Sequence, residues 1–130
     1  MDIRTHQQVD RQLCGDPVAI KEGYCLVRFL PTFTMRADDS GLVHGGFVFG
    51  AADYAAMLAV NHPNVVLAGA SVKFLKPVKA GDKVDAEARV TKAEGKKRSV
   101  SVTVRRDGEA VFEGELTCFV PERHVLAPSV

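Results

Sequence analysis

Hydrophobic and polar positions divide the chain into one long apolar segment and a later series of alternating segments. Residues 45–61 carry apolar side chains on nearly every side, and Pro63 follows closely, where a helix cannot continue. This segment is predicted to form one central helix enclosed by the rest of the protein. Gly50 and the repeated alanines keep that helix thin, so that strands or a second copy of the helix can approach closely.

The second half of the chain alternates apolar and polar side chains in four stretches, residues 68–77, 83–92, 98–106 and 109–120. Alternation with a period of two is typical of strands that have one buried face. Asp107-Gly108 separates the last two stretches and is a preferred two-residue hairpin. We therefore predict an antiparallel sheet whose dry face is covered by the central helix, an α+β fold.

The first part of the chain is less regular. Thr5 is predicted to cap a short helix that runs to about Leu13, within an N-terminal extension over residues 1–20. Residues 23–37 are rich in β-branched and aromatic side chains and contain Pro31, which predicts a strand bent at the proline or two short strands. No repeat or linker interrupts the chain, so residues 1–130 are expected to form a single domain.

Composition narrows the classes of function. The chain is 46% hydrophobic and 25% charged, as in ordinary soluble proteins, and its net charge of +1 argues against nucleic acid or a membrane as the main partner. Three separated cysteines without a CxxC pair indicate neither a zinc site nor a disulfide framework, and they favour the reducing cytoplasm. The N-terminus lacks the apolar stretch of a secretion signal. No metal or separate cofactor is expected.

Asp53 is the one formal charge in the middle of the most apolar segment. A buried carboxylate must be paired, protonated or open to a wet cleft. It is therefore either a structural aspartate or a general base or nucleophile with a perturbed pKa. The preceding Gly45 and Gly46 either only make the turn into the helix or leave its first amides bare for a ligand oxygen, which the positive end of the helix would stabilise.

The spacing of these groups predicts an assembly. Gly45 and Asp53 are eight residues apart, which corresponds to about 12 Å of helix. One carbonyl cannot reach both groups of the same chain. If both act on one substrate, two chains must supply them, and a symmetric homodimer with antiparallel facing helices would form two equivalent sites.

The stretch Gly41 to Asp53, "GLVHGGFVFGAAD", resembles the HGG-x(6)-D signature of hotdog-fold acyl-CoA thioesterases, especially the PaaI-like branch. The later "ASVKFLKPVKAGDKV" resembles the strand and turn that follow in that family. The resemblance covers roughly residues 23–120. It implies a hotdog fold, in which an antiparallel sheet wraps around one helix, and homodimers that often pair into homotetramers.

The resemblance also implies roles for individual residues. The Gly45 amide would polarise the thioester carbonyl, and Asp53 of the partner chain would activate water or attack directly. Ser71 matches a Ser/Thr that helps to position the water, and His44 would hold the loop or touch the substrate. Many relatives carry an asparagine upstream of HGG, where this chain has Asp38-Asp39-Ser40, so the contribution of that loop is open.

The expected function is hydrolysis of a small- to medium-chain or aryl acyl-CoA, with coenzyme A as part of the substrate. Gly46, Phe47 and Tyr54 are candidates for substrate binding, although the two aromatic residues are equally suited to a core. The alternative is a non-catalytic acyl-CoA-binding module, because residues 70–120 also resemble the effector domain of the regulator FapR. The residues that would bind the coenzyme A phosphates are open among Lys73, Lys76, Arg89 and the run Lys96–Arg98.

Overall fold

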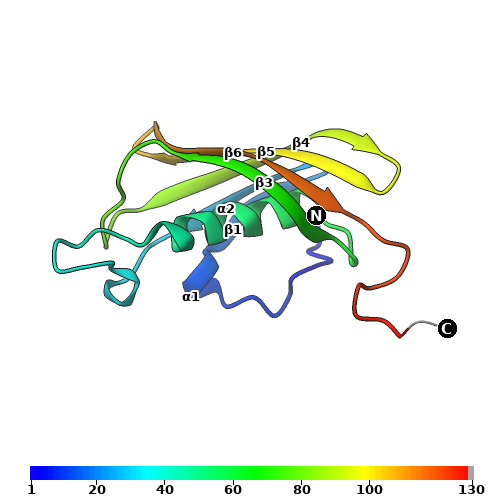
Figure 1. Cartoon of the computed structure of the whole chain (residues 1–130), viewed down its shortest axis with the longest axis horizontal. Coiled ribbons are helices and arrows are strands. Elements are labelled where there is room, and N and C mark those ends of the chain that lie inside the picture. Colours follow the sequence, from blue (N-terminus) through cyan, green and yellow to red (C-terminus); the bar gives the residue numbers. More distant parts are fainter. Residues whose placement is uncertain (129–130) are drawn as a thin grey trace.

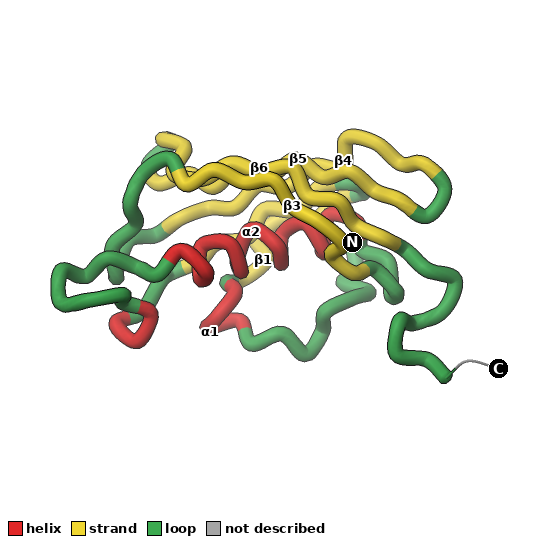
Figure 2. Tube along the Cα trace, in the orientation of Figure 1, coloured by secondary structure: helices red, strands yellow, loops and turns green. Residues whose placement is uncertain are grey.

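The computed structural model describes residues 1–128 and consists of one long helix against one sheet (Figures 1 and 2). The sheet has six antiparallel strands in the order β1-β2-β4-β5-β6-β3, so β1 and β3 are its edges. The elements, in chain order, are α1 (Arg11–Cys14), β1 (Asp16–Lys21), β2 (Tyr24–Phe29), a 3₁₀ turn (Phe33–Met35), α2 (Gly45–Val60), β3 (Val66–Phe74), β4 (Val84–Glu94), β5 (Lys97–Arg106) and β6 (Glu109–Phe119). This is the predicted α+β hotdog arrangement.

Helix α2 forms the centre of the core. Nine of its side chains are buried, most of them alanine, and it packs against β2, β4 and β5. Its last turn ends at Asn61, which adopts the left-handed conformation (φ 51°) that often terminates helices. The predicted helix over residues 45–61 is therefore confirmed to within one residue. Within residues 1–128, no helix is both long and apolar enough to cross a membrane.

The four alternating stretches are confirmed as strands, and the apolar sets of β4, β5 and β6 are buried, whereas β3 has no fully buried residue. The fully buried side chains include Val84, Val102, Phe112 and Leu116. Asp107 and Gly108 both have positive φ (51° and 82°), as the predicted hairpin between β5 and β6 requires. The helix is thus covered by the sheet on one side, while α1 and the N-terminal segment lie on the opposite side (Figure 1).

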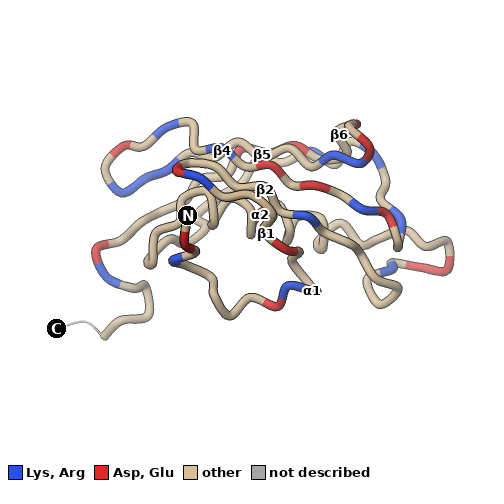
Figure 3. Tube along the Cα trace, turned by 180° about the vertical axis from the view of Figure 1, so that it is seen from behind, with Lys and Arg blue, Asp and Glu red and all other residues tan. Residues whose placement is uncertain are grey.

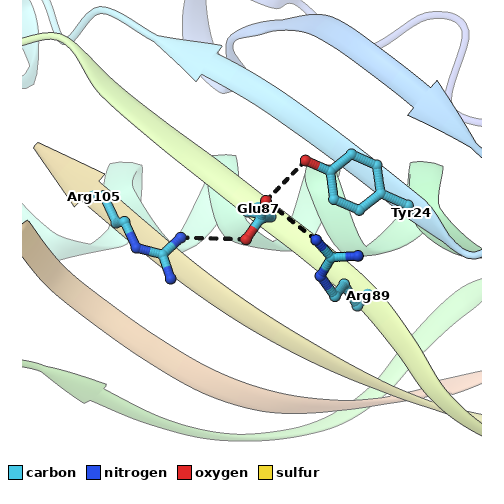
Figure 4. A network of polar contacts seen from close by, with 4 residues as sticks. All are labelled: Tyr24, Glu87, Arg89 and Arg105. Atoms are coloured by element: carbon cyan, nitrogen blue, oxygen red, sulfur yellow. Dashed lines mark hydrogen bonds and ion pairs between the residues drawn. The ribbon is translucent and has the colours of Figure 1, made fainter. Parts of the chain in front are cut away.

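The outer face of the sheet is polar, and its charges are paired. Glu87 of β4 accepts a hydrogen bond from the Tyr24 hydroxyl (2.8 Å), and it pairs with Arg105 (3.3 Å) and Arg89 (3.6 Å) (Figure 4). Arg28 pairs with Asp85 on the same face (3.0 Å). Along the backbone seen from behind, the positions of Lys and Arg are interspersed with those of Asp and Glu (Figure 3). This face therefore resembles an ordinary solvated surface.

The predicted N-terminal helix from Thr5 to about Leu13 is wrong. The helix begins only at Arg11, and Asp10 is its N-cap, accepting a hydrogen bond from the Gln12 amide (2.8 Å). The Thr5 side chain does not cap a helix but lies 2.8 Å from the His6 imidazole. His6 has φ 51°, and this residue turns the chain away from a helical path.

The region around Pro31 also differs from the prediction. Strand β2 ends at Phe29, and the chain beyond Pro31 forms the 3₁₀ turn and an isolated bridge between Arg36 and Val43 instead of a second strand. Strand β1 was not predicted. It contains Pro17 and a register irregularity between Pro17 and Ala19, which an edge strand tolerates because one side of it needs no partner.

Candidate functional site

Asp53 lies midway along α2, on the side of the helix that faces the beginning of β3. Within residues 1–128, its Oδ1 atom is buried and has no protein hydrogen-bond partner. Burial raises the pKa of this carboxyl to about 6. No backbone amide within residues 1–128 donates to this atom, so a structural role for Asp53 would require a partner from another subunit.

A hollow of about 380 Å³ lies beside Asp53. Four segments form its walls: α2, the start of β3, the N-terminal segment and the C-terminal segment. The residues of the walls that can form hydrogen bonds through their side chains are Thr5, His6, Asp53 and His124. The carboxylate is thus not sealed in the core but borders a space that can hold water or a ligand.

The N-terminus of α2 forms the second part of the candidate site. His44 is the N-cap residue, and its amide donates a hydrogen bond to the Met35 carbonyl (2.9 Å), which fixes the start of the helix. A Cβ atom added to Gly45 would lie 3.1 Å from Cε1 of Phe74. Glycine is therefore needed here for close approach between the helix start and β3, beyond any role in the turn.

A second hollow, of about 310 Å³, borders Gly45. Its walls are mostly apolar and include Val48, Phe74 and Val111, with Lys76 among the lining residues. Phe74 packs edge-on against Phe112, with the ring centroids 5.1 Å apart, and remains 55% exposed. Such an exposed aromatic side chain beside an apolar hollow is suited to contact an acyl or pantetheine chain.

The two hollows lie at opposite ends of strand β3. Val66 and Leu67, at its start, line the Asp53 hollow, whereas Phe74, at its end, lines the Gly45 hollow. The hollow beside Gly45 does not include Asp53, and the hollow beside Asp53 does not include Gly45, in agreement with the separation expected from helix geometry. Because β3 is an edge strand, its outer side is free of any neighbour within residues 1–128.

The other predicted residues occupy varied positions. Gly46 is exposed at the helix start, and Phe47 is half-buried with its ring edge-on to that of His44 (6.1 Å). Neither residue lines the Gly45 hollow or the Asp53 hollow, and their role in substrate binding stays a prediction. Tyr54 is 4% exposed and belongs to the core; burial raises its pKa, and the nearby Arg11 opposes that shift. Tyr54 lines neither hollow, so its side chain serves packing.

Ser71 lies elsewhere. It faces the outer side of the sheet, where it lines a groove with Lys73, Glu113 and Glu115, and it is not among the residues around Asp53. Its role in holding a water molecule stays a prediction from the resemblance. Asp38 is exposed and accepts hydrogen bonds from Ser40 in its own turn, which lowers its pKa.

The cysteines are consistent with structural roles. Burial raises the pKa of Cys25 and of Cys118 to about 12, so their thiols are poor nucleophiles. Burial also raises the pKa of Cys14, and the nearby Asp53 adds to that shift. Across residues 1–128, no cluster of three or more His, Cys, Asp or Glu side chains could hold a metal ion.

The tertiary structure adds residues that the sequence did not single out. Thr5 and His6 come from the N-terminal segment and His124 from the C-terminal segment, and all three border the Asp53 hollow. The sequence offers one signal for these residues, a Thr followed by a His in a polar segment. Nothing local indicates that this segment folds back onto the middle of α2.

Comparison with known proteins decides the family. The model of the family described as "Thioesterase superfamily" matches residues 40–113, more than half of the chain and the part that holds both Gly45 and Asp53. The chain belongs to the thioesterase superfamily. The superfamily expected from the sequence is thereby confirmed, while the PaaI-like branch is not singled out.

Individual relatives are similar over the whole chain or parts of it. An uncharacterized protein of Pyrococcus horikoshii has a solved structure that superposes with a TM-score of 0.96, at 53% identity over 98% of both chains. A methylthioribose-1-phosphate isomerase of Aquifex aeolicus is 59% identical over 115 residues, which are 88% of this chain but only 25% of that protein. The transcription factor FapR of Shouchella clausii is 36% identical over 62% of this chain and 42% of its own length. The chain thus spans a quarter to under half of these two curated relatives.

More distant structures share the fold. The PaaI protein of Escherichia coli superposes with a TM-score of 0.74 at 24% identity, over 80% of this chain and 81% of its own. A hypothetical thioesterase of Streptococcus pneumoniae, solved with coenzyme A, gives a TM-score of 0.76 at 19% identity, over 84% of this chain and 87% of its own. At these identities the likeness concerns the fold alone.

Proposed function

We propose that the protein is an acyl-CoA thioesterase that acts as a homodimer, with Asp53 as the general base. The observation that carries the proposal is the buried Oδ1 atom of Asp53, which lacks a protein partner and borders an open hollow. A carboxyl whose pKa burial raises to about 6 is ionised at neutral pH and still basic enough to accept a proton from water.

The edge strand supports a shared site. If the β3 strands of two chains pair antiparallel about a twofold axis near the middle of the strand, the Phe74 end of one chain meets the Leu67 end of the other. The Gly45 hollow of one chain then adjoins the Asp53 hollow of its partner. A dimer built this way also covers the unpaired edge of the sheet.

The chemistry follows from the two groups. Asp53 of one chain removes a proton from water, and the water oxygen attacks the thioester carbonyl. The carbonyl oxygen, which becomes negative, accepts a hydrogen bond from the Gly45 amide of the other chain at the positive end of α2. The C–S bond then breaks, and the thiolate leaves readily because it is a good leaving group. One such backbone donor contributes about 3 kcal/mol to stabilising the transition state.

The apolar walls around Gly45 favour a small- to medium-chain or aryl acyl group. Phe74 would contact that group from the exposed side of the hollow. The predicted binding roles of Gly46 and Phe47 rest on their place next to Gly45, since neither lines this hollow. The solved relative from Streptococcus pneumoniae contains coenzyme A, which supports coenzyme A as the thiol part of the substrate. The assignment to the PaaI-like branch is part of this proposal and rests on the HGG-x(6)-D pattern.

A second candidate function is supported by the similarity to FapR, a transcription factor. On this alternative the domain binds an acyl-CoA without cleaving it. The two functions make different demands on Asp53. A binding module does not need an unpaired buried carboxylate, whereas a hydrolase requires one as its base. For this reason hydrolysis is the preferred function.

A panel of acyl-CoAs, with release of free thiol as the readout, tests the proposal. We expect turnover by the wild type and its loss in Asp53→Ala and Asp53→Asn, with unchanged circular dichroism. Equal turnover in the wild type and both variants would overturn the role of Asp53. Binding of acyl-CoA measured by calorimetry, without turnover of any member of the panel, would support the binding module instead.

The shared site has its own test. Chains that carry Asp53→Asn are mixed with chains that carry Gly45→Val, each inactive alone, under conditions that exchange subunits. A heterodimer contains one site with both defects and one with neither, so activity should return. Absence of recovery, with exchange verified by mass spectrometry, would contradict the shared site while leaving hydrolysis itself untouched.

A further inference from the structure

The N-terminal segment, residues 1–10, is held at a defined position against the end of α2. Asn61, which is 2% exposed, donates from Nδ2 to the Asp2 carbonyl (2.8 Å), and its Oδ1 accepts from the Arg4 amide (2.8 Å). Because one amide side chain both donates to and accepts from the segment, it specifies a single register for the backbone. The attachment point lies about two helical turns beyond Asp53.

This attachment places His6 at the wall of the Asp53 hollow. Thr5 is 5% exposed, and its Oγ1 lies 2.8 Å from Nδ1 of His6. His6 adopts φ 51°, a conformation that residues other than glycine rarely occupy and that the surrounding structure must stabilise. Its half-buried ring lines the same hollow as the carboxylate. The segment therefore delivers a second titratable side chain to the Asp53 hollow.

We propose that His6 is a positioning residue for hydrolysis, an inference that rests on the function proposed above: its Nε2 holds the attacking water beside the Asp53 carboxylate. The proposal assigns His6 the tautomer in which Nδ1–H donates to Thr5 Oγ1, 2.8 Å away, so that Nε2 carries a lone pair and acts as an acceptor. The water donates one hydrogen to Asp53 and the other to His6. Its oxygen lone pair then faces the thioester carbonyl.

The proton balance of the step needs no further reactant. The hydrogen that the water shares with Asp53 passes to the carboxylate as the new C–O bond forms. When the C–S bond breaks, the thiolate takes up that proton, and the products are the free acid and the thiol. His6 neither gains nor loses a proton during the cycle, because it only orients the water.

Protonation of either side chain would disturb this arrangement. Burial raises the pKa of Asp53 to about 6 and lowers that of His6 below its ordinary 6.5. The remaining titratable side chains near Asp53 are Cys14 of α1, Cys118 of β6 and His124 of the C-terminal segment, and both thiols are protonated at these pH values. On the acid side, log(kcat/KM) should therefore fall with a limiting slope of about two, one for each side chain.

The test compares pH profiles of His6 variants of the full chain. His6→Gln keeps an acceptor oxygen but does not titrate, so it should retain most of the activity while the acid slope falls to about one. His6→Asn tolerates the positive φ but is too short to reach the water, and kcat should drop about 10-fold with KM little changed. Thr5→Val removes the acceptor for Nδ1–H and should lower kcat. Thr5→Ser keeps that acceptor and should retain the kcat of the wild type.

Two controls separate this inference from the proposed function. His124→Gln changes the other histidine of the hollow, whose Nδ1 already accepts from the Leu126 amide (3.0 Å), and should leave the slope at about two. NMR titration of the His6 ring, independent of turnover, should show a pKa below the ordinary 6.5, because burial disfavours the imidazolium. Turnover by the wild type with an unchanged slope in His6→Gln would overturn the role of His6 alone. Absence of turnover by the wild type would overturn both.

Discussion

Two carboxylates, Glu87 on the outer face of the sheet and Asp53 beneath it, have opposite surroundings. Glu87 receives a hydrogen bond from Tyr24 and pairs with two arginines, and these contacts, the tyrosine first, lower its pKa (Figure 4). Asp53 lacks a protein partner at Oδ1 within residues 1–128, and burial raises its pKa. A carboxylate that stabilises a fold is satisfied by its neighbours, whereas one left unsatisfied beside a hollow is available to a substrate.

The largest expected effect separates the two carboxylates by activity. Asp53→Asn should lower kcat about 10³-fold, the range for loss of a general base, because the amide cannot accept a proton from water. Glu87→Gln is the matched control and should leave kcat unchanged. Steady-state thiol release measures both variants. A comparable loss in Glu87→Gln would mean that the contrast between the two surroundings does not reflect function.

The second effect concerns the start of α2. In Gly45→Ala, the new Cβ would lie 3.1 Å from the ring of Phe74, which packs against Phe112, so either this ring or the helix start must shift. A displacement of this kind should lower kcat about 10-fold to 100-fold. Gly46→Ala is the control: its Cβ would lie 3.2 Å from the exposed His44 ring, which can turn away, and the loss should be much smaller. Equal losses would exclude close approach to Phe74 as the cause.

The third effect is the pH dependence of activity. Because Asp53 must be ionised to act as a base, kcat/KM should decline as the pH falls below about 6. Glu87→Gln should show the same profile as the wild type, since the Glu87 carboxylate is ionised well below this range. A profile that is flat between pH 5 and 8, that is, on both sides of the pKa of about 6, would be incompatible with Asp53 as the base.

The smallest expected effect concerns the free energy of unfolding, which should change in opposite directions in Asp53→Asn and Glu87→Gln at neutral pH. The folded pKa of Asp53, about 6, exceeds its ordinary 3.8, so the ionised carboxylate destabilises the fold. The destabilisation is absent below pH 3.8 and complete above about 6, and Asp53→Asn should therefore be more stable than the wild type only at the higher pH. Denaturant titrations at pH 4 and 7.5 check this, with the two pH values chosen on either side of the shift.

Glu87 should behave in the reverse way. Its folded pKa lies below its ordinary 4.5, so its stabilisation is present above pH 4.5 and is lost as the pH falls through the folded pKa. Glu87→Gln should lower the free energy of unfolding at neutral pH by no more than about 1 kcal/mol, because the pairs are partly exposed and screened. The same sign of change in both variants at neutral pH would contradict the comparison.

Much of the fold was predictable because its signals are local. The apolar segment that became α2 and the alternating stretches that became β3 to β6 follow from side-chain periodicity, and Asp107-Gly108 follows from the demands of a tight turn. The prediction failed at Thr5 and beyond Pro31. At Thr5, contact with the end of α2 overrides the local capping signal, and a positive φ at His6 is invisible in a residue type that rarely adopts it.

The candidate site was predictable only in part for the same reason. An isolated charge in an apolar segment and glycines at a helix start are visible in one stretch of sequence, and so Asp53 and Gly45 were found. The other residues around the Asp53 hollow with polar side chains come from the two ends of the chain, and Tyr54, adjacent to Asp53 in sequence, points into the core. Adjacent residues of a helix diverge by about 100°, so proximity in sequence does not imply a shared site.

The long helix and most of the strands can be recognised from the sequence alone, and so can the one acid among apolar neighbours. Periodicity and charge are properties of a single stretch of chain. Only the tertiary structure decided that this acid borders a hollow, that Gly45 lies at the far end of β3, and that the N-terminal segment places His6 next to the hollow. These features join segments that are remote along the chain, and they depend on how Asn61 and the strands pack.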